Sequence, residues 1–280
     1  IIKSENLASV KFDFSFAEVL YEKPSKELHV RGRIKWINNT CPFDVYFMDP
    51  KARTKEWLVY SNNNQSHSEC KFKVEENVRN SINTFVDSAK ALPILLSKEL
   101  FFPHMVNSYH GIEHTVRVLF LTHLLCDILN LSDVEKTSCC IAAIIHDLGK
   151  RSDREGAEHG FNSSELYNDK MSELISDVLI KDRILQAVRF HSVEDKDCPN
   201  HVKQDIIWKV LKDADALDRS RFAGKGCDKS YLRLDIYQSP SGQNIFDLAS
   251  YLPGWIQDID KENIYEALSE QVNTYSNITK

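Results

Sequence analysis

Four short segments place histidine and aspartate among apolar residues in a pattern typical of helices. In chain order they are His110-Gly-Ile-Glu-His114-Thr-Val-Arg117, Ala142-Ala-Ile-Ile-His146-Asp147-Leu-Gly-Lys150, Arg189-Phe-His191 and Lys212-Asp213-Ala-Asp215. Imidazole nitrogens and carboxylate oxygens are the ligands that Mn, Fe, Zn and Mg take in hydrolytic sites. The joint presence of these segments therefore predicts a metal centre that activates water.

The His146-Asp147 pair is the most distinctive of these features. At a helix end both side chains can bind one cation, because the backbone beyond that point is no longer restricted to helical geometry. The aspartate has two oxygens and can also bridge to a second cation. Single His-Asp pairs are common, and a histidine on an apolar helix is usually a hydrogen-bonded core residue, so the prediction depends on the four segments together.

In one-letter code, the local contexts H-x-x-R-V, H-D-x-G-K and A-D-x-L resemble the HD superfamily of metal-dependent phosphohydrolases, whose signature is H…HD…D on a helical bundle. The resemblance covers roughly residues 104–250. Carried over by position, it implies the metal ligands His114, His146, Asp147 and Asp215. Asp213 is the alternative to Asp215, because one helix cannot point both side chains the same way. Asp215 is favoured, since the family's aspartate usually follows a small residue and precedes x-Leu.

Superfamily members with two metals supply further histidines at similar places. By this resemblance His159, which lies 12 residues after Asp147, and His191 would form a second site bridged by Asp147. Two cations about 3.5–4 Å apart would then clamp a phosphoryl group. The sequence departs from those families because Ser192, and not a second histidine, follows His191. The number of cations is therefore left open between one and two.

Further residues near these ligands are predicted to act on the substrate. The predicted catalytic residues are Asp147, Lys150, His110 and Arg117, and the predicted substrate-binding residues are Lys150, Arg117, Arg219 and Arg221. His110 lies one helical turn before the first histidine ligand and would be a general acid or a substrate contact. Lys150 would stabilise phosphate charge or be a solvated lysine at a helix end. The two later arginines would bind phosphate or pair with Asp218.

Three acidic residues are also open between two roles. Glu113, Asp153 and Glu158 would either orient ligating histidines through the second ring nitrogen or be ordinary surface acids.

The resemblance implies a metal-dependent phosphohydrolase or phosphodiesterase that uses metal-activated water on a nucleotide or a related small phosphate. The cofactor would be a divalent ion, namely Mn, Mg, Fe, Ni, Co or Zn. Three alternatives compete with this function: a di-iron oxygenase of the same fold, a nuclease for single-stranded nucleic acid, and a nucleotide-binding regulatory module without turnover.

Charge is distributed unevenly along the chain and bears on the substrate. The net charge is −6; residues 1–100 hold 15 Lys and Arg against 13 Asp and Glu, and the remainder holds 20 against 28. An acidic domain repels polyanions unless cations or local basic residues intervene. The balance argues against a broad nucleic-acid surface and for a small phosphorylated substrate.

Apolar periodicity predicts which elements position these residues. From about Val74 onward apolar residues have helical spacing, and Pro93 ends or kinks that first segment. Further helices are expected near 111–130, 161–170, 171–191, 203–220 and 244–252, with another near the C-terminus. Ser132-Asp-Val-Glu135 is a capping-box pattern that predicts a helix from about Asp133 to His146, with Gly149 as its stop. Residues 76–280 are therefore expected to form an HD-type helical bundle domain.

In the first 75 residues two segments alternate polar and apolar side chains, as strands do, and two shorter apolar runs follow them. Predicted strands cover Val10–Phe16, Leu28–Trp36, Val45–Met48 and Trp57–Tyr60. Residues 1–75 are expected to form a small antiparallel β domain, which makes the fold mainly α but α+β overall. The role of this domain is left open between a structural one and the binding of a protein partner.

The cysteines and the apolar runs indicate a compartment. The 7 cysteines form no CxxC pair and no regular framework, which favours a reducing, cytoplasmic environment. No apolar run reaches the roughly 18 residues that a membrane-spanning helix needs, so no membrane association is expected. The chain begins at Ile1 without a basic-then-apolar leader, so no targeting segment is expected.

Overall fold

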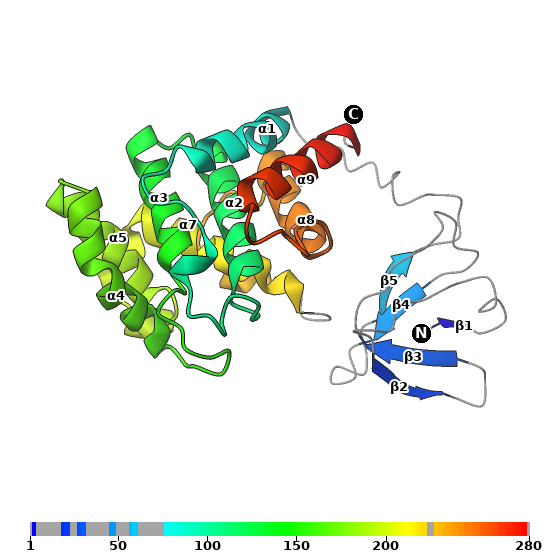
Figure 1. The fold of residues 1–280 in the computed structure, drawn as a ribbon. Helices are drawn as coiled ribbons and strands as arrows, with labels where there is room; N and C mark the ends of the chain where they lie inside the picture. Colours follow the sequence, from blue (N-terminus) through cyan, green and yellow to red (C-terminus); the bar gives the residue numbers. More distant parts are fainter. Residues whose placement is uncertain are drawn as a thin grey trace. The chain divides into compact units, whose positions relative to one another are not determined.

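The computed structural model describes residues 76–222 and 227–278, together with short strands before residue 61 (Figure 1). The chain divides into two compact units. One contains Ile1–Lys73 with Phe222–Gly226 and Thr279, and the other contains Val74–Arg221, Cys227–Ile278 and Lys280. The predicted assignment of two functional domains, 1–75 and 76–280, remains a prediction.

The predicted α+β fold class is wrong, because the described fold is mainly helical. From residue 76 on, the described residues contain no strand. Before it, the described strands are β1 (Ile2–Lys3), β2 (Glu18–Glu22), β3 (Glu27–Arg31), β4 (Val45–Met48) and β5 (Glu56–Tyr60), paired antiparallel in the order β2-β3-β1-β4-β5. Alternating side chains predict extended backbone locally, but a β domain also needs a buried core, which short paired strands do not establish.

The two strands predicted from short apolar runs are nevertheless found, at β4 and β5. β3 covers the first part of the predicted strand Leu28–Trp36. The predicted strand Val10–Phe16 lies outside the described residues.

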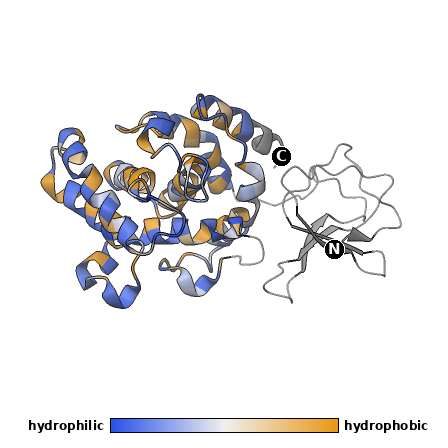
Figure 2. Cartoon of the chain, turned by 60° about the horizontal axis from the view of Figure 1, so that its bottom comes forward, coloured by the Kyte–Doolittle hydropathy of each residue, from blue (hydrophilic) through white to orange (hydrophobic). Residues whose placement is uncertain are grey.

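Helices make up the described fold from residue 76 on. The α-helices are α1 (Glu76–Lys90), α2 (Ile112–Ile128), α3 (Asp133–Ile145), α4 (Glu158–Leu174), α5 (Val178–Phe190), α6 (Asn200–Gln204), α7 (Ile206–Leu217), α8 (Pro240–Trp255) and α9 (Ile264–Ile278). Short 3-10 helices are η3 (Lys98–Leu100), η4 (Asp195–Asp197), η5 (Asp218–Arg221) and η6 (Lys229–Tyr231). Figure 2 shows that most of these helices carry both hydrophobic and hydrophilic positions, as expected of helices with one buried face.

α2 is the central helix of this unit. Every residue from His114 to Cys126 is buried, which is typical of a helix surrounded by other helices. α1, α3, α7 and α8 all pack against it. The first turn of α2 therefore delivers its side chains into the interior of the bundle.

α3 begins where the capping box predicted. The Ser132 hydroxyl accepts a hydrogen bond from the Glu135 backbone N–H at 3.4 Å, and the Glu135 carboxylate accepts one from the Ser132 backbone N–H at 3.2 Å. This arrangement satisfies two N–H groups that a helix start leaves without partners. The predicted start of the helix at Asp133 is confirmed.

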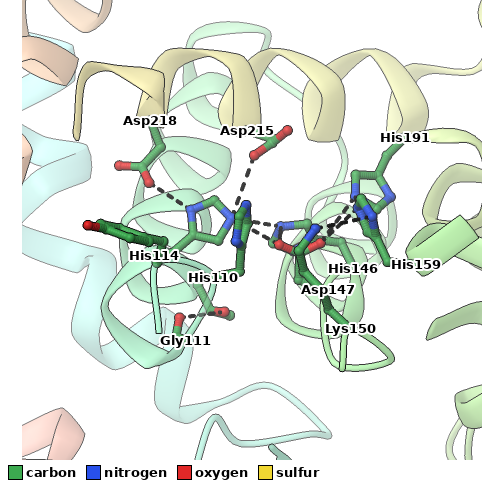
Figure 3. Close-up of polar contacts among 12 residues, drawn as sticks. His110, Gly111, His114, His146, Asp147, Lys150, His159, His191, Asp215 and Asp218 are labelled. Carbon is green, nitrogen blue, oxygen red and sulfur yellow. Dashed lines mark hydrogen bonds and ion pairs between the residues drawn. The ribbon is translucent and has the colours of Figure 1, made fainter. Parts of the chain in front are cut away.

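α4 and α5 form a pair that packs beside α3 and α7. The sequence predicted their boundary at residue 170/171, but α4 continues to Leu174 and α5 begins at Val178. Asp177 sets this start, because its carboxylate accepts hydrogen bonds from the backbone N–H groups of Leu179 and Ile180. The ends of α3, α4, α5 and α7 meet at one place, where the candidate ligands lie (Figure 3).

No described helix meets the length and hydropathy that crossing a membrane requires. The described cysteines are free thiols, at Cys126, Cys139, Cys140, Cys198 and Cys227.

Candidate metal centre

Six side chains from five helices converge on one buried region (Figure 3). Two of them lie in the first turn of a helix, His114 in α2 and His159 in α4. The others lie at helix C-termini: His146 caps α3 and is followed by Asp147, His191 caps α5, and Asp215 lies in the last turn of α7. Helix ends are suited to this role, because a side chain there can turn away from its own helix and face another.

The first group of ligand atoms belongs to His114, His146 and Asp147, which are all buried. The two histidine Nε2 atoms lie 3.1 Å apart. Asp147 Oδ2 lies 3.4 Å from Nε2 of His114 and 3.6 Å from Nε2 of His146. Asp215 Oδ1 is 3.6 Å from Nε2 of His114, on a side chain that is 25% exposed. This group has the donor set of a catalytic metal site with one open side.

The second group shares the same aspartate. Asp147 Oδ1 lies 3.2 Å from Nε2 of His159 and 3.5 Å from Nε2 of His191, and these two nitrogens are 3.2 Å apart. The two carboxylate oxygens of Asp147 therefore face two different histidine pairs, as a bridging ligand requires (Figure 3).

The other ring nitrogen of each of these histidines is already hydrogen-bonded. Nδ1 of His146, His159 and His191 lies 2.8, 2.5 and 2.6 Å from the carbonyl oxygens of Ala143, Gly156 and Val188, respectively. Nδ1 of His114 lies 2.7 Å from Asp218 Oδ2. A carbonyl or carboxylate oxygen only accepts, so Nδ1 carries the proton in each ring and Nε2 of the neutral ring carries a lone pair.

The helix ends explain two of these carbonyl contacts. The last four carbonyls of a helix have no partner within the helix. His146 and His191 each follow the last residue of a helix and bond to the carbonyl three residues back. Each of these hydrogen bonds gives a partner to a carbonyl at the helix C-terminus and also turns the Nε2 atom of the ring toward the candidate metal centre.

These lone pairs test whether the residues fit a cation. When both rings of a pair are neutral, their Nε2 atoms at 3.1 or 3.2 Å cannot hydrogen-bond to each other, because both only accept. Asp147 Oδ1 is buried and has no hydrogen-bond partner among the described residues. A divalent cation in each group would satisfy all of these atoms, and hydrogen bonds at the far nitrogen are the usual support of metal-binding histidines. The residues fit two cations.

The charge states also suit metal binding. Burial lowers the pKa of His146 to about 3, so the ring is neutral at neutral pH. Burial alone would raise the pKa of Asp147, but His146 and the other surrounding histidines hold it well below its usual range. The pKa of Asp215 is likewise lowered, because His114 and His146 outweigh the effect of burial. No proton has to leave these three groups before a cation binds.

The two aspartates of α7 have different surroundings. Asp213 accepts hydrogen bonds from the backbone N–H groups of Arg233 and Leu234, at 2.6 and 3.0 Å, and from the Tyr237 hydroxyl at 2.9 Å. Burial raises the pKa of Asp213 to about 6. Asp215, not Asp213, faces the histidines, which favours the assignment of Asp215 as ligand.

Asp218 was predicted only as a partner for arginines. It is buried, and its carboxylate contacts His114, Arg117 Nε at 2.6 Å and Arg221 Nη1 at 3.0 Å. Arg117 also donates to the Ile256 carbonyl at 3.0 Å. Both arginines are therefore engaged behind His114. The one signal in the sequence was that Asp218 lies three residues after Asp215, at the C-terminus of α7 and on the same side of it.

The other predicted substrate residues lie in different places. Arg219 stacks over the Tyr231 ring at 4.5 Å. Lys150 is 4% exposed, and its Nζ lies 3.3 Å from His159 Nδ1 and 3.4 Å from the Glu155 carbonyl. Because His159 Nδ1 donates to Gly156, it cannot also accept from the ammonium, so Lys150 keeps N–H donors beside the second group.

His110 lies beside the first group, with its ring centroid 5.5 Å from that of His114. Its Nδ1 is 2.8 Å from Asp153 Oδ1, and the same aspartate accepts from the Tyr109 backbone N–H at 3.3 Å. Burial lowers the pKa of His110 to about 4, although Asp147 and Asp153 oppose this.

Of the three acids predicted to orient ligating histidines or to be surface groups, Asp153 contacts a histidine, but His110 is not one of the predicted ligands. Glu113 instead accepts from the Asp258 backbone N–H, and Glu158 accepts from the Gly156 backbone N–H.

Gly149 of the H-D-x-G-K segment does more than stop a helix. A Cβ atom at this position would lie 2.3 Å from the Ser163 backbone nitrogen of α4. The Gly149 N–H also donates to the Ser163 hydroxyl at 2.9 Å. The glycine lets the turn after Asp147 pack directly on α4, the helix that supplies His159.

Comparison with known proteins agrees with this geometry. Residues 111–220 match the family model described as HD domain. The matched range includes the six converging side chains, Lys150 and Asp218, and it ends before Arg221. No curated protein and no solved structure matches the chain.

Proposed function

We propose that the chain hydrolyses phosphoester or phosphoanhydride bonds, which is supported by the match of residues 111–220 to the HD domain, a domain typical of metal-dependent hydrolases. The proposed substrate is a nucleotide or a related small phosphorylated molecule. One observation carries the proposal: Asp147 lies between two pairs of histidines whose Nε2 lone pairs face each other.

The cations proposed for this centre would be divalent, held by His114, His146, Asp147 and Asp215 in the first group and by Asp147, His159 and His191 in the second. When bound, such cations polarise a phosphoryl oxygen and lower the pKa of bound water toward neutrality. The chain's own contribution is to hold these ligands in fixed orientations through the Nδ1 contacts.

Lys150 supports the choice of a phosphorylated substrate. Its buried ammonium has one carbonyl partner at 3.4 Å and N–H donors left beside His159. A buried cation with unused donors favours an anionic ligand, because pairing offsets the cost of burying the charge. We therefore assign Lys150 to phosphate binding, whereas Arg117 and Arg221 are assigned to holding Asp218.

His110 is proposed to take a proton during the reaction. Its Nδ1 donates to Asp153, which leaves Nε2 as the acceptor, and burial keeps the ring neutral at neutral pH. A neutral, oriented imidazole is suited to accept a proton from an attacking water. A general acid in the free protein would instead need a protonated ring, so the geometry favours the role of base.

The test is a substrate screen on chelator-treated protein reloaded separately with Mn, Mg, Co, Ni, Fe and Zn. Nucleoside mono-, di- and triphosphates, cyclic nucleotides and a synthetic phosphodiester are offered, and released phosphate or alcohol is measured. We expect turnover with at least one metal. Asp147→Ala should abolish turnover and the binding of both cations. The matched control is Asp169→Ala, an exposed aspartate on α4.

Turnover that survives Asp147→Ala would contradict the site assignment. The donor set also suits a di-iron oxygenase, since both histidine pairs are present. Iron-dependent oxygen consumption without release of phosphate from any substrate would establish that alternative and overturn the hydrolase.

A further inference from the structure

The C-terminus of α5 is held by side chains of α7. The Trp208 indole N–H donates to the Phe190 carbonyl at 3.1 Å. The Lys212 ammonium donates to the His191 carbonyl at 2.8 Å and to the Val193 carbonyl at 2.6 Å. Carbonyls at a helix C-terminus lack partners within their own helix, so α7 supplies donors that α5 does not provide.

Trp208 and Lys212 are four residues apart on α7 and therefore share one face. Trp208 is 1% exposed, and the Lys212 ammonium lies 5.4 Å from the centre of its ring. A cation at a helix C-terminus also interacts favourably with the helix dipole. We call these two residues the α7 clip.

The clip acts on the backbone of a predicted ligand. The ring of His191 is oriented by its Nδ1 contact with the Val188 carbonyl, which lies in α5 itself. The position of the His191 main chain, however, is fixed from α7 through the bond to Lys212. The two contacts together determine where Nε2 of His191 points.

The rest of α7 links the clip to the first group. Asp215 lies three residues after Lys212 on the same helix, and it faces His114. The loop after α5 is held as well, because Asp195 lies 3.7 Å from Lys212 and pairs with Arg233 at 2.6 Å. One helix thus supplies a ligand to the first group and fixes a ligand of the second.

We infer that Lys212 is a positioning residue for the second cation, which it acts on by fixing His191 at the end of α5. The inference rests on the proposed function to the extent that the second group holds a cation. It adds a structural condition for that binding: α5 must remain docked on the clip.

The experiment compares Mn(II) binding by the full chain and by Lys212→Met, which keeps a similar stem and loses the amino group. Binding is measured by calorimetry and by metal content after dialysis, and electron paramagnetic resonance reports the coupling between two neighbouring Mn(II) ions. We expect the second Mn(II) to bind about 10–100-fold more weakly, as for other changes behind a metal ligand. The first should bind unchanged, and the coupled signal should disappear at concentrations that saturate the unmodified protein.

Lys212→Arg, which retains a donor cation, should restore the coupled signal. Lys209→Met on the same helix is the matched control and should bind both ions as the unmodified chain does. If Lys212→Met does not fold, Trp208→Phe removes a single donor, and it should weaken the second ion alone by a smaller factor.

Two bound Mn(II) ions of unchanged affinity in Lys212→Met would overturn the inference while leaving the proposed function intact. Equal weakening of both ions would also overturn it, since the clip would then act on the whole fold. A single ion in the unmodified chain would remove both the second site and the clip's role. Retention of metal in Asp147→Ala would instead contradict the proposed function.

Discussion

The two halves of the candidate centre are anchored in different ways. His114, in the first half, donates from Nδ1 to the buried carboxylate of Asp218, which Arg117 and Arg221 hold in turn. His159 and His191, in the second half, donate from Nδ1 only to backbone carbonyls. A carboxylate makes a ligating histidine more basic than a neutral carbonyl does, so the first half is expected to hold its cation more tightly.

Charge and exposure also predict that the first half binds its cation more tightly than the second half does. The first half has two aspartates, Asp147 and Asp215, whereas the second has only the shared Asp147. The side chains of His114 and His146 are fully buried, but that of His159 is 12% exposed. We therefore expect one tightly bound cation and a second that exchanges more readily. The difference between the halves can be tested by changing one anchor at a time.

The largest effect is expected from the two aspartates of α7. Asp215→Ala should weaken the first cation by more than the roughly 10–100-fold typical of a change behind the ligands, because it removes a ligand and a charge. Stability should change little, since Asp215 is partly exposed. Metal content and the urea midpoint of unfolding measure the two quantities separately.

Asp213→Ala is the matched variant and should behave in the opposite way. It leaves the N–H groups of Arg233 and Leu234 and the Tyr237 hydroxyl without their acceptor. Unsatisfied buried groups cost about 1–3 kcal/mol each, so the free energy of unfolding should fall by about 3 kcal/mol or more while both cations remain bound. Loss of metal in Asp213→Ala, with retention in Asp215→Ala, would reverse the assignment.

An intermediate effect is expected from Asp218→Asn, which keeps an oxygen acceptor but removes the charge. The first cation should bind about 10–100-fold more weakly and the second should be nearly unchanged, because Asp218 contacts only His114 among the proposed ligands. Unfolding should also become easier, since Arg117 loses its buried counter-charge. Calorimetric titration with Mn(II) measures the affinity of each cation in this variant. The control is Asp182→Asn, which changes an exposed aspartate on α5. Equal affinity in both variants would show that the carboxylate anchor does not distinguish the halves.

The parts of the centre that could be predicted are those that depend on local sequence. Ser132 and Glu135 predict the start of α3 because a capping box needs only neighbouring residues. The end of that helix then places the His146-Asp147 pair. Asp218 and Lys212 were not assigned their roles, because each acts on a residue from a different helix and no local pattern records such a contact. Supporting contacts of this kind become visible only when the helices are packed together.

Apolar patterns in the sequence failed to predict two other features, namely the position of the boundary between α4 and α5 and the fold of the first 75 residues. Apolar periodicity predicted two helices but put their boundary at 170/171, whereas the Asp177 cap starts α5 at Val178. In the first 75 residues two short apolar runs located β4 and β5, yet the strand patterns did not establish the β domain that was predicted from them. Period-two patterns report local extension, but a domain also depends on burial between distant residues.

The smallest effect is expected from pH, and it should separate the two cations. Burial lowers the pKa of His159, but the carboxylate of Asp147 outweighs it and raises the pKa above the ordinary value of 6.5. Burial lowers the pKa of His146 to about 3. Below the raised pKa the second cation must displace a proton from His159, so in the pH range just below this pKa its affinity should fall by at most about tenfold per pH unit. The first cation has no proton to displace from His146 in this range.

Lys150 provides an internal check on that prediction. Its positive charge lowers the pKa of His159, so Lys150→Met should raise this pKa further. Release of the second cation on acidification should then begin at a higher pH than in the unmodified chain, while the first cation stays bound. Mn(II) titrations across the pH range measure both midpoints. A shift to lower pH in Lys150→Met would mean that the proton competing with the second cation does not reside on His159.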